Sequence, residues 1–173
     1  MKTLIVYSSL TGNTKKVAEA IKEVFGDEAD LFPVEEKPDA KAYDLIAVGF
    51  WVDRGTADKK AQAYITELRE KKVALFATLG AYPDSEHARK SMQNAGALLD
   101  ASNQLMGDFI CQGKVNGNLV EKFKDLPQGH PHAMTPERIA RHREAAKHPD
   151  EADLTKAKAI FSVIREKVYE DVL

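Results

Sequence analysis

Short apolar runs alternate with amphipathic stretches along the chain. Apolar runs of strand length occur at residues 2–8, 29–34, 44–51, 72–78 and 105–112. Stretches with apolar residues three and four positions apart predict helices at 13–25, 57–71, 84–101, 136–147 and 153–170. Strands and helices therefore alternate, and the run at 44–51 is apolar enough to be buried on both faces. The pattern predicts an α/β fold with a doubly wound, five-stranded parallel sheet and helices on both faces.

The segment between the first strand and the first helix is rich in hydroxyl groups. It consists of Ser8, Ser9, Leu10, Thr11, Gly12, Asn13 and Thr14. The first amides of a helix lack intrahelical partners and lie at the positive end of the helix dipole, so such a turn binds anions. Because the segment contains no Lys or Arg, we expect one terminal phosphate rather than a triphosphate with magnesium. The alternative is an ordinary turn with a capping Ser or Thr.

Two later segments also follow predicted strands, and both carry an aromatic residue. Ligands of doubly wound sheets bind outside the carboxyl ends of the strands, which is where these segments are expected. The second segment contains Trp51, Val52, Asp53, Arg54 and Gly55, and the third contains Thr78, Leu79, Gly80, Ala81 and Tyr82. A phosphate loop with two aromatic segments beside it describes a site for FMN. The alternatives are a core or subunit-interface role for Trp51 and a surface turn for Tyr82.

These segments resemble those of the flavodoxin family. Ser9, Thr11, Gly12 and Thr14 match the family pattern Ser/Thr-x-Thr-Gly-x-Thr, and the two aromatic segments correspond to the family's flavin-flanking loops. The resemblance covers about residues 1–112 and the last helix, and the phrases at 49–57 and 79–85 are similar to flavodoxin-like proteins of anaerobic bacteria. It implies the sheet order 2-1-3-4-5 and FMN as the cofactor.

The expected cofactor contacts divide into three groups. Ser8, Ser9, Thr11, Gly12, Asn13 and Thr14 are expected to hold the phosphate, with Leu10 in the same loop. Trp51 and Tyr82 are expected to flank the isoalloxazine ring. Backbone groups around Asp53–Gly55 and Gly80–Tyr82 are expected to contact its polar edge. Neighbouring Val52, Thr78, Leu79 and Ala81 complete the predicted site.

The chain departs from typical flavodoxins in charge. Those proteins are strongly acidic, whereas this chain has a formal net charge of −2. In many of them a glycine directly follows the tryptophan of the second loop, but here Val52, Asp53 and Arg54 precede Gly55. A positive charge at Arg54 favours an anionic reduced flavin. We therefore expect a reduction potential less negative than that of a highly acidic flavodoxin.

Length and composition narrow the class of protein. The chain has 173 residues, 43% of them hydrophobic and 30% charged, which suits a single domain at 1–173. The small net charge favours neither nucleic acid nor a membrane as a partner. Without a recognisable signal peptide or membrane-length apolar stretch, a cytoplasmic location is expected. A monomer or a homodimer is expected as well. Cys111, the single cysteine, allows no internal disulfide, and its place in the last strand predicts burial.

A long excursion, 113–152, precedes the C-terminal helix and contains four of the five histidines. No metal site is expected, because the His130-Pro131-His132 sequence is more typical of a surface turn. The predicted helix at 136–147 carries a basic face, which is either solvated or docks an acidic partner. The acidic residues near the flavin segments are expected to be helix N-terminal charges, with partner recognition as the alternative: Asp53, Asp58, Asp84 and Glu86.

The sequence thus predicts an FMN-binding protein that passes electrons to a partner reductase. FMN exchanges electrons singly or in pairs, and the protein binds and orients it. We name no catalytic residue and no metal ligand. One alternative is a small FMN-dependent NAD(P)H reductase of quinones or similar acceptors. The other is a flavodoxin fold without flavin that serves as a binding module.

Overall fold

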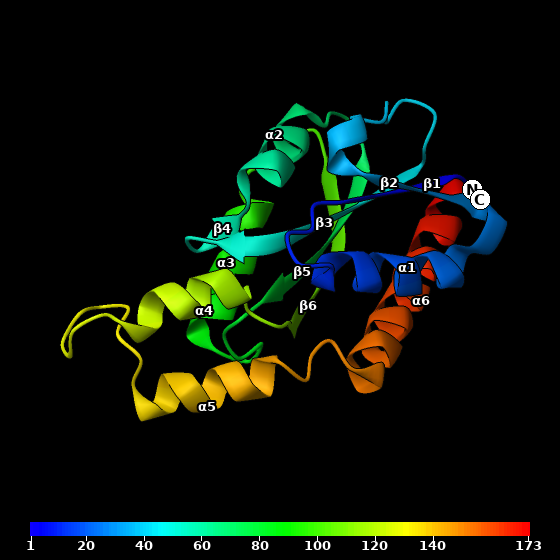
Figure 1. Ribbon diagram of the computed structural model, residues 1–173. Coiled ribbons are helices and arrows are strands. Elements are labelled where there is room, and N and C mark those ends of the chain that lie inside the picture. The colour runs from blue at the N-terminus through cyan, green and yellow to red at the C-terminus, as the bar shows by residue number, and fades with distance from the viewer.

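The computed structural model describes residues 1–173, except for the side chain of Leu119. Five parallel strands form its centre in the order β2-β1-β3-β5-β6 (Figure 1). They are β1 (Thr3–Tyr7), β2 (Ala29–Pro33), β3 (Leu45–Asp53), β5 (Lys72–Leu79) and β6 (Gln104–Gln112). The short β4 (Thr56–Ala57) pairs antiparallel with the end of β3 and lies outside this order. The predicted sheet order 2-1-3-4-5 is therefore confirmed.

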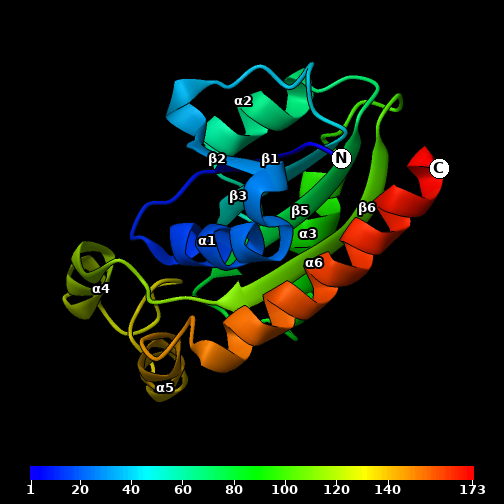
Figure 2. The same ribbon diagram turned by 90° about the vertical axis from the view of Figure 1, so that its right-hand side faces the viewer.

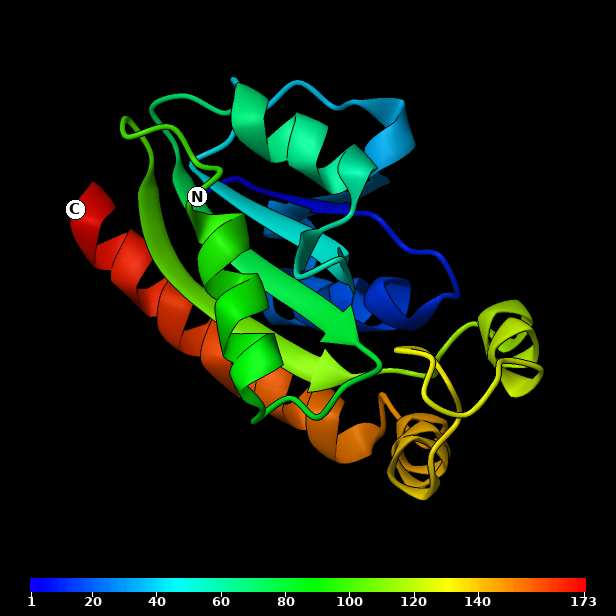
Figure 3. The ribbon, with the colours of Figure 1, turned by 90° about the vertical axis from the view of Figure 1, so that its left-hand side faces the viewer.

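Two helices cover each face of the sheet. In Figure 2, α1 (Asn13–Phe25) and α6 (Glu151–Val172) lie on the face toward the viewer. Figure 3 shows α2 (Lys59–Glu67) and α3 (Glu86–Gly96) on the opposite face. Short 3-10 turns at Gly26–Glu28 and Val34–Glu36 flank β2. Each face has its own buried apolar cluster, as the alternation of strand side chains requires.

Close packing across β3 explains why this strand contains a glycine. Gly49 is the register partner of Phe76 on β5. A methyl group at Gly49 would lie only 2.2 Å from the Phe76 ring, so no larger residue fits without displacement of that ring. Phe76 also meets Phe161 of α6 edge to face, with ring centroids 5.9 Å apart. The contact of Phe76 with Phe161 helps to hold α6 against the β5–β6 side of the sheet (Figure 2).

The strand predicted at 44–51 continues beyond Trp51 into a β-hairpin, which corrects the expectation that a loop follows at this point. β3 continues to Asp53, and Arg54 and Gly55 turn the chain with φ values of 50° and 78°. Two successive positive φ values are typical of the tight type I′ turn. Trp51 consequently lies within the sheet, as the register partner of Thr78. Asp53 lies on a strand, so the prediction that it is a helix N-terminal charge is wrong.

Two further helices interrupt the segment between β6 and α6. They are α4 (Gly117–Lys124) and α5 (Pro136–Ala145), and both lie beyond the carboxyl ends of the parallel strands (Figures 2 and 3). The sequence pattern predicts α5 but not α4. Stacking of Phe123 on His132, and bonds from the Arg138 guanidinium to the carbonyls of Pro131 and Ala133, order the connection between them. Among the described residues, no helix is long and apolar enough to cross a bilayer.

Candidate functional site

The loop between β1 and α1 leaves the first turn of α1 open. Gly12 is the N-cap residue of α1, has φ 90°, and provides no side-chain cap. The Ser9 hydroxyl accepts hydrogen bonds from the amides of Gly12 (3.1 Å) and Lys15 (3.4 Å). A methyl group at Gly12 would have no heavy atom within 4 Å, so the space above this turn is open. Among the described side chains, none accepts from the amides of Asn13 and Thr14, which suits these two amides to a phosphate group.

The segments after β1, β3 and β5 are called the first, second and third loops. The first and second loops meet at a buried carboxylate. The Ser8 hydroxyl donates a 2.6 Å hydrogen bond to Oδ2 of Asp58. The Trp51 amide donates to Oδ1 of the same carboxylate at 3.3 Å, and the Ala61 amide donates to Oδ2 at 3.4 Å. Asp58 lies at the N-terminus of α2, as predicted, where it is the N-cap residue, and it is only 2% exposed. Its burial leaves it no access to a partner protein, so Asp58 positions the two loops.

The environment of Asp58 acts on its charge in two opposing ways. Burial raises the pKa of the Asp58 carboxyl, because the ionised form loses its water. Hydrogen bonds from Ser8, Ala61 and Trp51 oppose that rise by favouring the carboxylate. The carboxylate therefore depends on all three donors, and loss of one leaves a buried oxygen poorly satisfied.

The first and third loops meet through two threonine hydroxyls. Oγ1 of Thr14 and Oγ1 of Thr78 are 2.9 Å apart, and both side chains are buried. On the third loop, the buried Gln112 side chain donates to the Gly80 carbonyl at 3.1 Å. Of the predicted phosphate-binding residues, Ser8 and Thr14 thus use their hydroxyls inside the protein. The Ser8 amide also donates to the Gly49 carbonyl, at 2.9 Å, so of these two residues the Thr14 amide is the one that remains available for the predicted contact.

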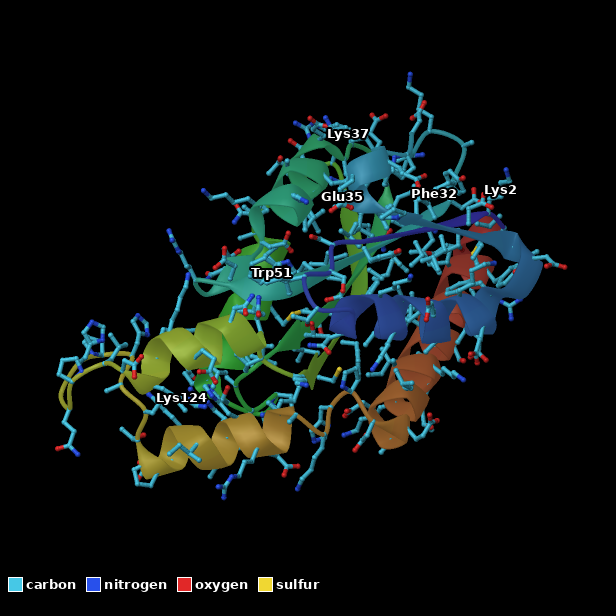
Figure 4. All side chains as sticks on the ribbon, viewed as in Figure 1. Lys2, Phe32, Glu35, Lys37, Trp51 and Lys124 are labelled. Carbon is cyan, nitrogen blue, oxygen red and sulfur yellow. The ribbon has the colours of Figure 1, made fainter. Side chains whose placement is uncertain are left out.

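The two predicted ring-flanking residues lie on the second and third loops. Trp51 is half-buried on β3, where Figure 4 labels it, and Tyr82 is 42% exposed in the turn after β5. Both segments are at the carboxyl edge of the sheet. The Asn94 side chain of α3 donates to the Gly55 carbonyl at 2.7 Å and fixes the tip of the hairpin. Arg54 is exposed at this tip. Contact of these groups with a flavin stays a prediction.

Hydrogen bonds join the start of the 113–152 segment to the first loop and to the end of the same segment. The Asn13 side chain donates to the Lys114 carbonyl at 2.9 Å, and the Lys114 amide donates to the His148 carbonyl at 3.1 Å. Gly113 is buried so close to Asn13 that a methyl group there would lie 2.7 Å from Nδ2. Asn13, which is predicted to bind the phosphate, therefore also anchors the start of this segment.

His148 joins α5 to α6 through charged neighbours. Its Nδ1 lies 2.6 Å from Oδ2 of Asp153, and its Nε2 lies 3.1 Å from Oε1 of Glu144. Asp153 also forms a capping box with Asp150 at the start of α6. These carboxylates raise the pKa of the His148 imidazole above its usual value. Nearby, Cys111 is buried, as predicted, and burial raises the pKa of its thiol.

Several residues that hold the site together are missed by the sequence analysis. Asn94 and Gln112 are absent from the predicted site, and the bond of Ser8 to Asp58 is not foreseen. Each of these side chains bonds to a residue at least 32 positions away along the chain. Only the helix-capping position of Asp58 has a local signal, because Asp favours the N-cap.

A doubly wound parallel sheet in the order β2-β1-β3-β5-β6, with helices on both faces, defines a flavodoxin-like α/β protein. The chain matches the Flavodoxin domain family over residues 4–162, and it belongs to this family. It is 35% identical over 162 residues to the flavodoxin-like domain-containing protein BilS of Clostridioides difficile (strain CD3). That match covers 91% of this chain and 92% of the relative.

Two further comparisons agree with this assignment. The BilS protein of Clostridium symbiosum (strain WAL-14163) is 29% identical over 172 residues, with 89% of this chain and 90% of the relative covered. The crystal structure of oxidised Flavodoxin 2 from Bacillus cereus is similar, with a TM-score of 0.60. It is 21% identical, with 96% of this chain and 99% of that one covered, and it supports the fold alone.

Proposed function

We propose that this protein binds FMN and carries electrons to a partner reductase. The observation that carries the proposal is the set of internal hydrogen bonds that fix three loops around an open helix N-terminus. Ser8 and Trp51 share the Asp58 carboxylate, and Thr14 bonds to Thr78. A site whose loops are held by the protein itself pays little ordering entropy when a ligand binds. Membership of the flavodoxin family supports FMN as that ligand.

The residues of the loops suit the different parts of FMN. The amides of the first turn of α1, with the hydroxyls of Ser9 and Thr11, would hold the phosphate. Trp51 and Tyr82 would lie against the ring, and the backbone near Gly55 and Gly80 would meet its polar edge. When bound, FMN supplies the one- and two-electron chemistry. The chain supplies binding, orientation and the local charge, and we assign no side chain a proton-transfer role.

A test with nicotinamide nucleotides separates the carrier from a reductase. FMN-loaded protein is mixed anaerobically with NADH or NADPH, and the visible flavin absorbance is followed. A carrier keeps its absorbance over minutes, and dithionite then bleaches it, which serves as the control that the flavin can be reduced. Rapid bleaching by either nucleotide alone would overturn the carrier proposal in favour of an NAD(P)H reductase. Protein that takes up no FMN would instead support a flavin-free binding module.

A further inference from the structure

Charge is distributed unevenly along this chain. Residues 113–149, here called the basic arm, contain seven Lys and Arg and four Asp and Glu. The remaining residues contain eighteen Lys and Arg and twenty-three Asp and Glu. The basic arm therefore carries a formal charge of +3 and the rest of the chain −5, with histidines neutral. The small net charge of the whole chain is therefore the sum of a positive segment and a negative remainder.

The basic arm lies beside the proposed FMN site. Its two helices, α4 and α5, stand beyond the carboxyl ends of the strands, where the three loops are (Figures 2 and 3). A pocket of about 420 Å³ separates the phosphate loop from the arm. Its wall includes Asn13 and Lys16 on one side, and Lys114, Lys147 and His148 on the other. Lys16 of α1 and Lys114 and Lys147 of the arm therefore border the same pocket.

Much of this charge is not neutralised within the chain. Lys124 pairs with Glu121, and Lys147 pairs with Glu144. Among the described side chains, those of Lys122 and Arg143 are exposed and make no ion pair. Unpaired, exposed cations on one side of a protein steer the approach of an oppositely charged partner.

Three exposed apolar side chains belong to segments at the carboxyl end of the sheet, whereas others, such as Leu105 and Val163, lie on β6 and α6. Leu10 in the phosphate loop is 57% exposed, Tyr82 in the third loop is 42% exposed, and Ile139 on α5 is 39% exposed. Apolar groups with a charged rim are typical of protein–protein contact surfaces. A surface that meets only small ions needs no such groups. The combination favours a folded protein as the partner.

We propose that the basic arm, with the exposed rim of the flavin loops, docks an acidic redox protein. This inference rests on the proposed function, because it places the partner at the edge where the FMN ring is expected. The partner would present carboxylates to α4 and α5, and one carboxylate would enter the pocket beside Lys114 and Lys147. The charges are opposite to those of a strongly acidic carrier, which docks on a basic partner. It gives Lys122 and Arg143 a role in partner recognition.

The test uses two redox proteins of opposite charge as probes. Isotope-labelled protein is titrated with an acidic ferredoxin and, separately, with basic cytochrome c, and backbone amide shifts are recorded by NMR. We expect ferredoxin to shift amides of the basic arm and of the flavin loops, and added salt to reverse the shifts. The titration is run with and without FMN. Arm-localised binding in flavin-free protein would support docking even if FMN uptake fails.

Matched charge reversals complete the test. The double variant Lys122→Glu/Arg143→Glu should weaken ferredoxin binding by about tenfold or more. The control Lys41→Glu/Lys167→Glu changes the net charge equally, on the loop before β3 and near the end of α6, and should have a much smaller effect. Thermal unfolding verifies that both variants fold.

Several results would overturn the proposal. These are shifts confined to other faces, tighter binding of cytochrome c, salt-independent binding, or equal losses in the two double variants. Binding of the arm to vesicles of anionic phospholipid without binding of ferredoxin would assign the surface to a membrane instead.

Discussion

The hydroxyl of Ser8 donates a 2.6 Å hydrogen bond to the carboxylate of Asp58, 50 residues further along the chain. Ser8 directly follows β1 at the start of the proposed phosphate loop, whereas Asp58 caps α2 and also accepts from the Trp51 amide. One buried carboxylate thereby sets the position of the phosphate loop relative to the proposed ring-flanking hairpin.

Replacement of Asp58 tests this relationship. Asp58→Asn keeps the shape but has one acceptor oxygen for three donors, so a buried amide or hydroxyl loses its partner. We expect a loss of about 1–3 kcal/mol in the free energy of unfolding and weaker FMN binding. Denaturant unfolding and flavin titration measure the two effects. Asp84→Asn, at an exposed position before α3, is the control and should change stability by less than about 0.5 kcal/mol. Equal effects of the two variants would refute the role of Asp58.

The glycines at the two ends of α1 provide a matched pair. Gly12 and Gly26 both have positive φ, and at both positions a methyl group would meet open space. Each change to Ala should therefore cost about 1–2 kcal/mol of stability through backbone strain. Only Gly12→Ala should weaken FMN binding, because its methyl group enters the space proposed for the phosphate. Similar FMN affinities in the two variants would show that the phosphate lies elsewhere.

The ion pairs of His148 predict a pH-dependent stability. Asp153 and Glu144 raise the pKa of His148 above its reference value of 6.5. A raised folded-state pKa stabilises the protein fully below the unfolded-state pKa, and this stabilisation is lost as the pH rises through the folded-state pKa. Wild type should exceed His148→Gln in unfolding free energy more at about pH 6 than at about pH 9. His87→Gln on α3 should keep the wild-type pH dependence, and a constant difference between wild type and His148→Gln would count against the ion pairs.

Arg54 should influence the reduction potential. It is exposed at the hairpin tip with φ 50°, a conformation that Asn adopts more readily than Ala. Arg54→Asn removes the positive charge without adding backbone strain and should make the potential more negative. A unit charge about 10 Å away in water contributes about 0.4 kcal/mol, or about 20 mV for one electron. A spectroelectrochemical titration of wild type and Arg54→Asn in low salt measures the shift in potential. Identical potentials would contradict the predicted effect of Arg54.

Elements with a clear local pattern are predicted well from the sequence. The helix at 13–25 is found with the same bounds, because its apolar spacing is regular and Gly26 ends it. The confirmed sheet order follows from the family resemblance. The helix α4 has no such signal, since Asn116, Gly117 and Asn118 at its start are all typical of turns. The hairpin turn is hidden because Arg-Gly is not the usual Asn-Gly pair.

The candidate site is predicted only in part for a different reason. The hydroxyl-rich loop and the aromatic residues are visible because the chemistry lies in consecutive residues. The sequence does not show which hydroxyl groups face a ligand. Ser8 and Thr14 bond to Asp58 and Thr78, respectively, which lie far along the chain. Their inward orientation depends on the register of β1, β3 and β5, which only the folded sheet defines.

The most direct test of the account compares the binding of FMN with that of riboflavin, which lacks the phosphate. Both flavins are titrated with flavin-free protein, and quenching of their fluorescence gives the two dissociation constants. Loss of even one charge-assisted hydrogen bond costs about 1.5–3 kcal/mol, so riboflavin should bind at least about tenfold more weakly than FMN. FMN should also remain bound after desalting, with the visible absorption bands of oxidised flavin. Equal affinities, or no retained FMN, would contradict a phosphate site at the start of α1.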